Sequence, residues 1–363
     1  MEALSQAKKL INEAQKVLVL VPNNPSPDVL GSALSLSYSL NDANKIVNFY
    51  PNKISKKYFS LFPEKIMPEK FLISVRGKEI SELYYEKKNQ ILNIYLSSNA
   101  KEIKKDDIIF RPLKEDLLSE ENIDLLITIG VESLENLGDF YENNFKLFYQ
   151  TPILNIDNKN TNNKFGNTNL IFKNLPISGG LIKIIKSFDK APVQNIRTWL
   201  LAGIISFSQE NILNSETIEE ALSLIKMDVN YKKIINFFSP TQKDSEAKLL
   251  EQVLKNTEFN QTLGLPLMLL RKEDFEKNNS SPKELVFVLK ALSNKIFCFS
   301  SFLVLWESPF FGLGIRGIFY SSNSKAIEKI LKSFSGKTKG RAVLFELKER
   351  DLRKAKERIV EII

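Results

Sequence analysis

Short apolar runs alternate with helical periods over the first half of the chain, and this alternation restricts the available folds most. Apolar runs of strand type lie at 17–21, 45–50, 124–129 and 152–156, and helical periods lie at about 29–40, 178–188 and 193–208. Near-continuous apolar strands separated by helices are typical of a parallel sheet that is covered on both faces. In such a sheet the functional loops follow the carboxyl ends of the strands.

Two further regions differ from this pattern. Residues 70–110 contain the strand-like runs FLISV, ILNIYLS and DIIF, separated by lysine-rich and Asn-containing turns, which predicts an antiparallel insertion. A helical, charged stretch then precedes a second α/β unit. We therefore predict an N-terminal α/β domain over 1–190 with an insertion at about 66–112, a helical connector over 191–256, and a smaller C-terminal α/β domain over 257–363.

The composition limits the chemistry and the setting of the protein. The 363 residues include no histidine and one cysteine, Cys298, which lies in the apolar run IFCFSSFLVLW. Zinc sites of the Cys and His type are therefore excluded by count, and we expect a buried structural thiol at Cys298. The lone cysteine also predicts a reducing, cytoplasmic setting. No apolar run reaches the roughly 20 residues of a membrane span, so no membrane partner is expected.

The charge balance points to the class of partner. Lysine and arginine number 51 against 43 aspartate and glutamate, which gives a net charge of +8. A positive balance of this size favours polyanionic partners such as nucleotides or nucleic acid, although many lysine-rich chains are basic without binding one.

The first apolar run leads into the loop VPNNPSPDVLGS, residues 21–32, ahead of a helical segment. Ser26 is a good N-cap, Pro27 is favoured at the first helical position, and Asp28 suits the positive end of the helix dipole. These residues therefore predict the start of a helix. Asp28 is also a candidate metal ligand, because one or two carboxylates with waters and a substrate phosphate are enough to hold Mg²⁺.

By its spacing, this loop resembles the first motif of the DHH phosphoesterase superfamily, which includes RecJ-like nucleases and bifunctional oligoribonuclease and phosphoadenosine-phosphate phosphatases. The family pattern is His-x-Asn-Pro-Asp-x-Asp-x-x-Gly-Ser, and it is matched at Asn24, Pro25, Asp28, Gly31 and Ser32. Pro22 stands where the family has its histidine, and Ser26 stands where it has its first aspartate.

Three later segments are similar to the other catalytic motifs of the family. In DLLITIGVESLENLG, Gly130 stands where the family has an aspartate at the end of a strand. In PILNIDNKNTNNKFG, Asp157 is retained, while Asn158 and Lys159 replace two histidines. In WLLAGIISFSQE, Phe207 falls where an aspartate is expected.

The C-terminal unit resembles the substrate-binding domain, DHHA1, that accompanies the catalytic domain in this family. The family's glycine-rich run ending in histidine corresponds here to SGKTKGR, and an arginine that contacts substrate in the family corresponds to Arg316. The resemblance implies substrate binding by Arg316, Gly336, Lys337, Thr338, Lys339 and Arg341. A solvated basic loop accounts for the run SGKTKGR equally well.

Family members bind two divalent metals, usually manganese, which activate water and neutralise phosphate. Among the positions that carry ligands in the family, this chain keeps only Asp28 and Asp157 as carboxylates. An Asp-Asn turn at the end of a strand is the structural alternative for Asp157. We therefore predict that the dinuclear site is lost and that no cofactor is bound, with manganese or magnesium needed only for a residual activity.

The substitutions and the resemblance together predict a non-catalytic module that binds a nucleotide or short RNA or DNA. One alternative is a metal-dependent phosphodiesterase with a reduced site on Asp28 and Asp157, helped by carboxylates such as Glu132 or Glu210. Another is a structural protein that docks a partner through the 66–112 insertion, and a homodimer is a further possible partnership. Four aromatic residues near Arg316 fit either base stacking or core packing, namely Phe310, Phe311, Phe319 and Tyr320.

Overall fold

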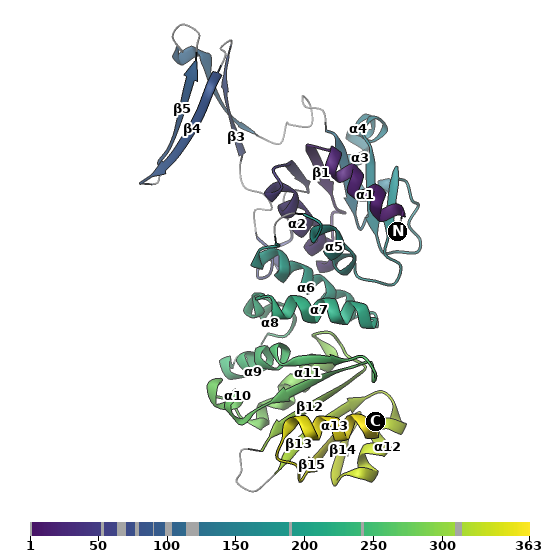
Figure 1. Cartoon of the computed structure of the whole chain (residues 1–363). Helices are drawn as coiled ribbons and strands as arrows, with labels where there is room; N and C mark the ends of the chain where they lie inside the picture. The colour runs from purple at the N-terminus through teal and green to yellow at the C-terminus, as the bar shows by residue number, and fades with distance from the viewer. Residues whose placement is uncertain are drawn as a thin grey trace. The chain divides into compact units, whose positions relative to one another are not determined.

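The computed structural model describes residues 2–51, 54–63, 70–76, 80–89, 91–98, 104–113, 123–188, 191–240, 243–308 and 314–363 (Figure 1). The chain divides into two compact units, one formed by Met1–Ile66 with Asp124–Ile363 and the other by Met67–Ile123. The insertion expected at about 66–112 falls almost wholly in the second unit. The other predicted domain bounds stay predictions.

A five-stranded sheet of order β2-β1-β7-β8-β9 forms the N-terminal part of the first unit, and all neighbouring strands in it are parallel. Its strands are β1 (Lys16–Leu20), β2 (Ile46–Tyr50), β7 (Leu125–Ile129), β8 (Ile153–Asp157) and β9 (Thr168–Ile171). Every residue of β7 and β8 is buried. Because successive side chains point to opposite faces, both faces of these strands are covered, and the predicted parallel α/β class is confirmed.

The strand order reverses beside β1. The chain passes from β1 through α2 (Pro27–Asp42) to β2 on one side, and it later returns to β7 on the other side. In open α/β sheets, ligands bind outside the carboxyl ends of the strands at such a reversal. The loops after β1 and β7 therefore occupy the position where a site is expected.

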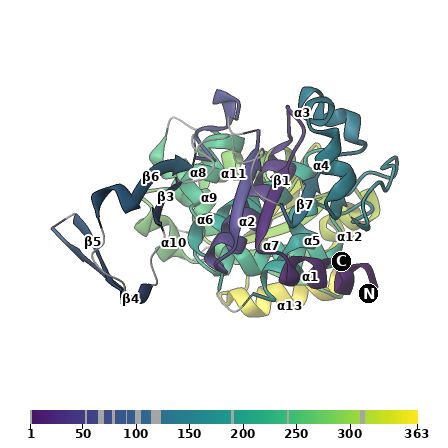
Figure 2. The ribbon, with the colours of Figure 1, turned by 90° about the horizontal axis from the view of Figure 1, so that it is seen from above.

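Three helices pack together beside this sheet, namely α2, α5 (Ile177–Ile185) and α6 (Gln194–Ser208) (Figure 2). The predicted start of α2 is confirmed, since Ser26 Oγ accepts a hydrogen bond from Val29 N at 3.3 Å and Pro27 is the first helical residue. Gly31 allows α2 to approach α6 closely, because a Cβ there would lie 2.6 Å from the Trp199 carbonyl oxygen. The other helices of this part are α1 (Glu2–Glu13), α3 (Asp139–Asn143), α4 (Phe145–Gln150), α7 (Ser215–Lys226), α8 (Tyr231–Phe238) and α9 (Asp244–Lys255).

The C-terminal part of the first unit is a six-stranded sheet of order β10-β11-β12-β13-β15-β14, in which only β11 and β12 are parallel neighbours. One face packs on α12 (Ser324–Ser333) and α13 (Leu352–Ile362) through a core that includes Leu305, Phe319 and Phe345. The strands are β10 (Thr257–Asn260), β11 (Leu265–Leu270), β12 (Ser301–Glu307), β13 (Ile315–Ser321), β14 (Gly336–Lys339) and β15 (Ala342–Leu347), and two more helices are α10 (Lys272–Lys277) and α11 (Leu285–Asn294). The predicted second α/β sheet is confirmed.

The sequence predicts a turn or loop across Gly336 to Arg341, and this is wrong for the first four residues. They form strand β14, which pairs antiparallel with β15 at the edge of the sheet. Alternating lysines are tolerated there because an edge strand keeps one side open to solvent. The turn comes at Gly340, whose φ of 61° is a conformation that glycine adopts without strain.

The second unit contains two antiparallel ribbons. β3 (Lys70–Val75) pairs with β6 (Ile108–Leu113), and β4 (Ile80–Lys88) pairs with β5 (Ile91–Ser98). The expected antiparallel pairing is confirmed. Strand β4 was not predicted, because charged residues interrupt its alternation of apolar and polar side chains and its stability depends on pairing with β5. Across the described part of the chain, no helix has the length and apolarity that crossing a membrane requires.

Replacing Gly31 by alanine tests the close approach of α2 and α6. An alanine in a helix interior normally stabilises by about 0.5–1 kcal/mol relative to glycine. Here we expect the free energy of unfolding to fall by about 1–3 kcal/mol, because the added methyl meets the Trp199 backbone. Urea denaturation measures the change, with the exposed Ser324→Ala as a control expected to stay within about 0.5 kcal/mol. A stabilised Gly31→Ala variant would contradict the packing.

Candidate functional site

The carboxyl edge of the five-stranded sheet carries the loops that hold the predicted catalytic positions. Residues 21–26 follow β1, residues 130–133 follow β7 and residues 158–167 follow β8. Gly138, which lies beyond β7, is beside the β1 loop, since a Cβ there would lie 3.7 Å from Asn23 Nδ2. Parallel pairing therefore brings segments that are far apart in the sequence to one edge.

Asp28 is buried in the first turn of α2 and is 4% exposed. Its carboxylate accepts hydrogen bonds from Ile177 N at 2.9 Å, Ser178 N at 3.0 Å and Ser178 Oγ at 2.6 Å. The two N–H groups belong to the first turn of α5, whose own N-cap residue, Pro176, makes no side-chain cap. Asp28 therefore caps α5 from another helix, and both of its carboxylate oxygens are used in doing so.

The surroundings of Asp28 oppose its charge. Burial raises the pKa of its carboxyl to about 6, although the hydrogen bonds from Ser178 and Ile177 favour the charged form. Helix α6 also closes the space beside it, because a Cβ on Gly203 would lie 2.9 Å from Asp28 Oδ1. A cation would have to displace these neighbours and the α5 donors in order to bind Asp28.

Gly130 occupies the place of a family aspartate but does not accommodate a side chain. Its φ of 68° is in the left-handed region, where residues other than glycine are strained. A Cβ there would lie 2.4 Å from Val29 Cγ2 at the start of α2. A carboxylate at this position would therefore require the loop and the helix to move apart.

The other substituted positions also have local structural roles. Ser26 caps α2, and Pro22 belongs to the loop that leads to it. Phe207 lies in the last turn of α6 and is half-buried.

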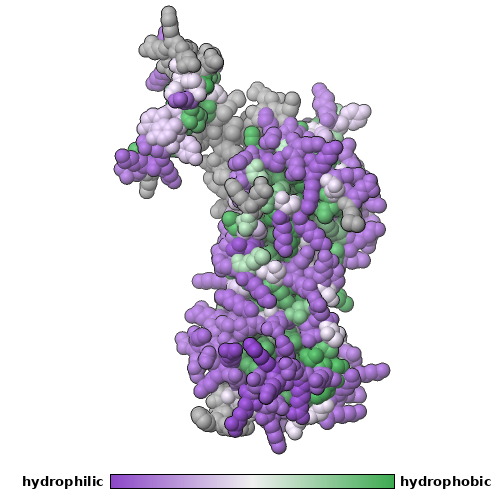
Figure 3. Space-filling model, viewed as in Figure 1, coloured by the Kyte–Doolittle hydropathy of each residue, from purple (hydrophilic) through white to green (hydrophobic). Residues whose placement is uncertain are grey.

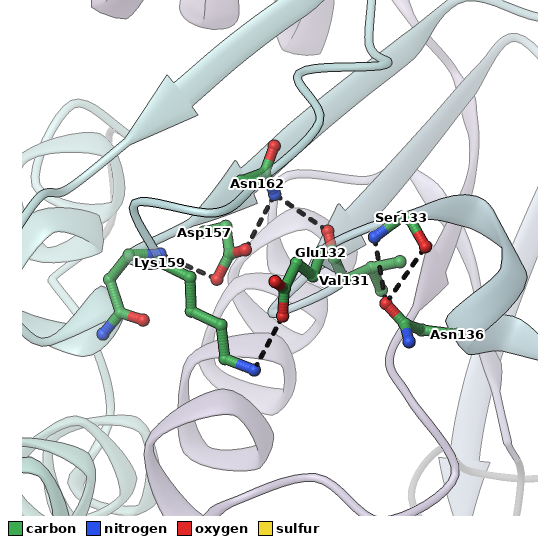
Figure 4. Close-up of polar contacts among 8 residues, drawn as sticks. Val131, Glu132, Ser133, Asn136, Asp157, Lys159 and Asn162 are labelled. Carbon is green, nitrogen blue, oxygen red and sulfur yellow. Dashed lines mark hydrogen bonds and ion pairs between the residues drawn. The ribbon is translucent and has the colours of Figure 1, made fainter.

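Asp157 is buried at the end of β8 and holds its loop in place (Figure 4). Its Oδ1 accepts a hydrogen bond from Asn158 N at 2.8 Å, and its Oδ2 accepts one from Asn162 Nδ2 at 2.7 Å. Asn162 Nδ2 also donates to the Val131 carbonyl oxygen at 3.0 Å. Asp157 thus helps to tie the loop after β8 to the loop after β7.

A buried asparagine network behind Asp157 was missed from the sequence. Asn155, fully buried in β8, donates to Asn162 Oδ1 at 2.8 Å and to Asn169 Oδ1 at 3.1 Å. It also accepts from Thr128 Oγ1 at 3.2 Å. The available signal was an asparagine inside an apolar strand, since buried polar side chains need partners.

Glu132 and Lys159 pair across the same two loops (Figure 4). Glu132 Oε2 lies 3.1 Å from Lys159 Nζ, and hydrogen bonds from Thr161 and then Lys159 lower the pKa of Glu132. The lysine that replaces a family histidine is therefore engaged by a carboxylate. Glu210, the other candidate helper, is exposed beyond the end of α6.

These residues do not fit a two-metal site. Such a site needs several carboxylates and imidazoles that converge on the cations. Asp28 caps α5, Asp157 orders a loop, and Glu132 is paired with Lys159. Within the described ranges, no group of three or more Asp, Glu, Cys or His side chains is placed to hold a metal ion.

The pairing register of the C-terminal sheet brings three predicted substrate-binding residues to one face. Three rows of directly opposed residues cross the sheet: Trp306–Arg316–Glu346, Val304–Ile318–Leu344–Lys337 and Phe302–Tyr320–Ala342–Lys339. Directly opposed residues point to the same face, so Arg316, Lys337 and Lys339 share a face with Tyr320. Gly336 and Thr338 alternate to the other face, and Arg341 lies in the turn before β15.

This face is open over β15 and β14 and partly covered over β13, where Ile318 is buried. Arg316 and Tyr320 are half-buried, Leu344 is 45% exposed, and Lys337 and Lys339 are exposed. We call these five residues the open basic face. The ring of Tyr320 stacks on Phe302 with centroids 5.0 Å apart, which fixes its orientation. Of the other three aromatics, Phe319 belongs to the core on the opposite face, and Phe310 and Phe311 lie outside the described residues.

Arg316 is held by one neighbour but retains an unused donor. Its Nη2 lies 2.6 Å from Glu346 Oε1 on β15. Among the described residues, Arg316 Nε and Trp306 Nε1 are buried donors without an acceptor. Because such donors are costly to leave unpaired, an oxygen from water or a ligand is expected beside them.

Cys298 does not add a nucleophile. It is half-buried rather than fully buried, and burial raises the pKa of its thiol. A raised pKa lowers the thiolate fraction at neutral pH, and the thiolate is the reactive form.

The chain matches no protein-family model and no curated protein. Solved structures to which it is similar include an exopolyphosphatase-related protein from Bacteroides fragilis, with 16% identity over 99% of this chain and 96% of that chain and a TM-score of 0.38. The exonuclease RecJ bound to manganese matches with 12% identity over 98% and 93% of the chains and a TM-score of 0.35. CDC45 from Entamoeba histolytica matches with 11% identity over 99% and 98% and a TM-score of 0.29.

These three proteins belong to the DHH superfamily, which the motifs of this chain resemble. All three TM-scores are below 0.5 and all three identities are below 25%. No activity, ligand or partner is therefore carried from them to this chain.

The variant Asp28→Asn tests the buried carboxyl through the pH dependence of stability. The pKa of Asp28 is about 6 in the folded chain and 3.8 in the reference state, so folding is coupled to proton uptake between these values. The free energy of unfolding should therefore fall as the pH rises from about 4 to above 6, by about 3 kcal/mol for a shift of roughly two units. The asparagine of the variant does not titrate, so the stability difference between wild type and variant should change by this amount over the window.

Urea denaturation at a series of pH values measures this difference. Glu210→Gln, at an exposed carboxylate, is the control and should shift the curve by less than about 0.5 kcal/mol. A constant difference between wild type and Asp28→Asn from pH 4 to 7 would show that Asp28 keeps an ordinary pKa.

Proposed function

We propose that this chain binds a nucleotide or a short RNA or DNA strand on the open basic face and does not hydrolyse it by two-metal chemistry. The observation that carries this proposal is the register of the C-terminal sheet, which places Arg316, Lys337 and Lys339 on the same face as Tyr320. The motif resemblance, which implies substrate binding at the same residues, agrees with it.

The open basic face has the two components that single-stranded nucleic acid requires. Lys337 and Lys339 are two residues apart on one strand, so their side chains leave the sheet about 7 Å apart on the same side. Cations at this spacing suit successive phosphate groups of an extended strand, and an oriented aromatic ring suits a base. Tyr320 provides such a ring, since it is stacked on Phe302 and lies on the same face as the two lysines.

A solvated basic edge is the competing explanation, and two features of the face argue against it. Leu344 lies between the lysines and Ile318, so the surface is apolar as well as basic. The unpaired buried donors of Arg316 and Trp306 add a need for acceptor oxygens. A face that served only for solubility would need neither feature.

The residues of the carboxyl edge support binding without turnover. The retained carboxylates have structural partners, and Gly130 packs against Val29 where a ligand side chain would stand. The alternative, a phosphodiesterase with a reduced metal site, requires Asp28 and Asp157 to exchange these partners for a cation.

Charge reversal at the edge strand tests the binding face. We expect Lys337→Glu with Lys339→Glu to weaken the binding of a fluorescent short oligonucleotide at least tenfold, because two phosphate contacts become repulsive. The slope of log affinity against log salt should fall by about two, one for each lost contact. Fluorescence anisotropy at several salt concentrations measures both quantities.

The matched control reverses two exposed lysines on the opposite side of the same sheet, Lys325→Glu with Lys332→Glu in α12. These variants have the same net charge as the test pair and should bind nearly as tightly as wild type. Equal weakening in both pairs would indicate general electrostatic attraction and would overturn the assignment of the face.

Manganese titration separates a binding module from an enzyme. By calorimetry we expect no stoichiometric Mn²⁺ uptake, because the carboxylates of Asp28 and Asp157 accept hydrogen bonds from the protein. A labelled dinucleotide incubated with Mn²⁺ should also remain intact. Stoichiometric uptake and cleavage, both lost in Asp157→Asn, would establish the phosphodiesterase instead.

A further inference from the structure

The β4–β5 ribbon, Ile80–Lys88 paired with Ile91–Ser98, has an apolar surface that the proposed nucleotide site does not use. Within the described residues the ribbon is a sheet of two strands only. An isolated two-stranded ribbon is marginally stable in water, and a third strand or a covering layer is normally required.

The register of the ribbon divides its side chains between two faces. Leu83 stands opposite Leu96, Tyr85 opposite Ile94 and Lys87 opposite Leu92. Directly opposed residues share a face, so five large apolar side chains lie together. We call this set, Leu83, Tyr85, Leu92, Ile94 and Leu96, the apolar ribbon face.

The opposite face of the ribbon is more polar and internally bonded, although it also carries the exposed side chains of Tyr84, Ile91 and Tyr95. Glu86 Oε1 accepts hydrogen bonds from Asn93 Nδ2 at 3.2 Å and from Tyr95 Oη at 2.9 Å. The rings of Tyr84 and Tyr95 stack with centroids 4.8 Å apart. Three of the four charged residues of the ribbon, Glu82, Glu86 and Lys88, lie on this face, so the other face is the more apolar one, as in a sheet with one side covered.

The apolar ribbon face is nevertheless exposed. Tyr85 is 68% exposed, Leu83 65%, Leu92 51% and Ile94 41%. Apolar side chains lie at the surface of this unit (Figure 3). Taking about 200 Å² for each fully exposed large side chain, these four contribute about 450 Å², which is in the range of the largest apolar patches on monomers, and such patches are often functional.

We propose that two copies of this chain pack against each other through the apolar ribbon face. The face is uncharged except for Lys87, which stands at its end beside the turn at Asn89. When two such faces pack together, no charged side chains meet at the centre of the contact, and each Lys87 reaches solvent at the rim. Sheets packed in this way lie about 10 Å apart with interleaved side chains.

The charges of the ribbon disfavour other occupants. Its described residues carry Glu82 and Glu86 against Lys87 and Lys88, so the ribbon is nearly neutral. A nucleic acid or an anionic lipid surface would be expected to meet an excess of positive charge. A second copy brings the same neutral apolar surface, so one symmetric contact covers the apolar ribbon face of both copies.

The area sets the strength of this contact. Two faces of about 450 Å² bury about 900 Å² in total, which is below the roughly 1,200–2,000 Å² of stable interfaces. The dimer is therefore weak and reversible, and its population rises with protein concentration.

Sedimentation velocity on the full chain tests the dimer, with Tyr85→Lys as the disrupting variant. We expect the wild type to shift from monomer to dimer with concentration and Tyr85→Lys to raise the dissociation constant at least tenfold. The matched control is Tyr149→Lys, the same substitution at a tyrosine of α4 that is 91% exposed and lies in the first unit. It should dimerise as the wild type does.

Cross-linking tests which face is used without disturbing its apolar character. In a Cys298→Ser background, Ile94→Cys places a thiol on the apolar ribbon face, and Ser97→Cys places one on the polar face. Mild oxidation should produce a covalent dimer from Ile94→Cys and little from Ser97→Cys.

A monomeric wild type at 100 µM would overturn the proposal and would leave the nucleotide assay unaffected. Dimers that persist in Tyr85→Lys, or that cross-link equally through both cysteines, would overturn the assigned face. Because oligonucleotide binding is measured separately, failure of the dimer and failure of the binding face are distinguishable.

Discussion

Asp28 and the first turn of α5 are 149 residues apart in sequence, and the hydrogen bonds between them hold the helical side of the N-terminal sheet together. Pro176 leaves the start of α5 without a side-chain cap, so Asp28 supplies one from α2. Helix α6 closes over the same point, with Gly203 almost in contact with the carboxylate. Removing one partner of such a buried contact leaves unpaired polar groups, which is why the neighbouring helices depend on it.

Asp28 matches a catalytic motif in sequence, but its contacts in this fold are structural. A carboxylate that serves a metal needs free oxygen atoms directed at solvent or at other ligands. Asp28 has neither, and Asp157 directs its oxygens to Asn158 and Asn162 within its own loop. The edge of the sheet where ligands of α/β proteins bind is therefore built from structural contacts at Asp28 and Asp157, while the register of the C-terminal sheet places Arg316, Lys337 and Lys339 on one face.

Much of the fold was predictable because it depends on local patterns. Apolar runs with intervening helical periods predicted the parallel sheet, and Ser26 with Pro27 predicted the start of α2. Strands β4 and β14 were harder, since charged residues interrupt their alternation and pairing with a neighbour makes them strands. The asparagine network around Asn155 was not predictable, because its partners come from three separate segments.

The sequence by itself determined which chemical groups are available: no histidine, one cysteine, and carboxylates at only two of the motif positions. It also located Arg316, Lys337 and Lys339 as candidate contacts. Only the tertiary structure decided how these groups are used. Hydrogen bonds between distant segments engage Asp28 and Asp157, and strand register places the three basic residues on one face. The physical reason is that both outcomes depend on which segments pair in the fold. That pairing decides which groups a carboxylate can bond to and which strand residues share a face, and composition does not encode it.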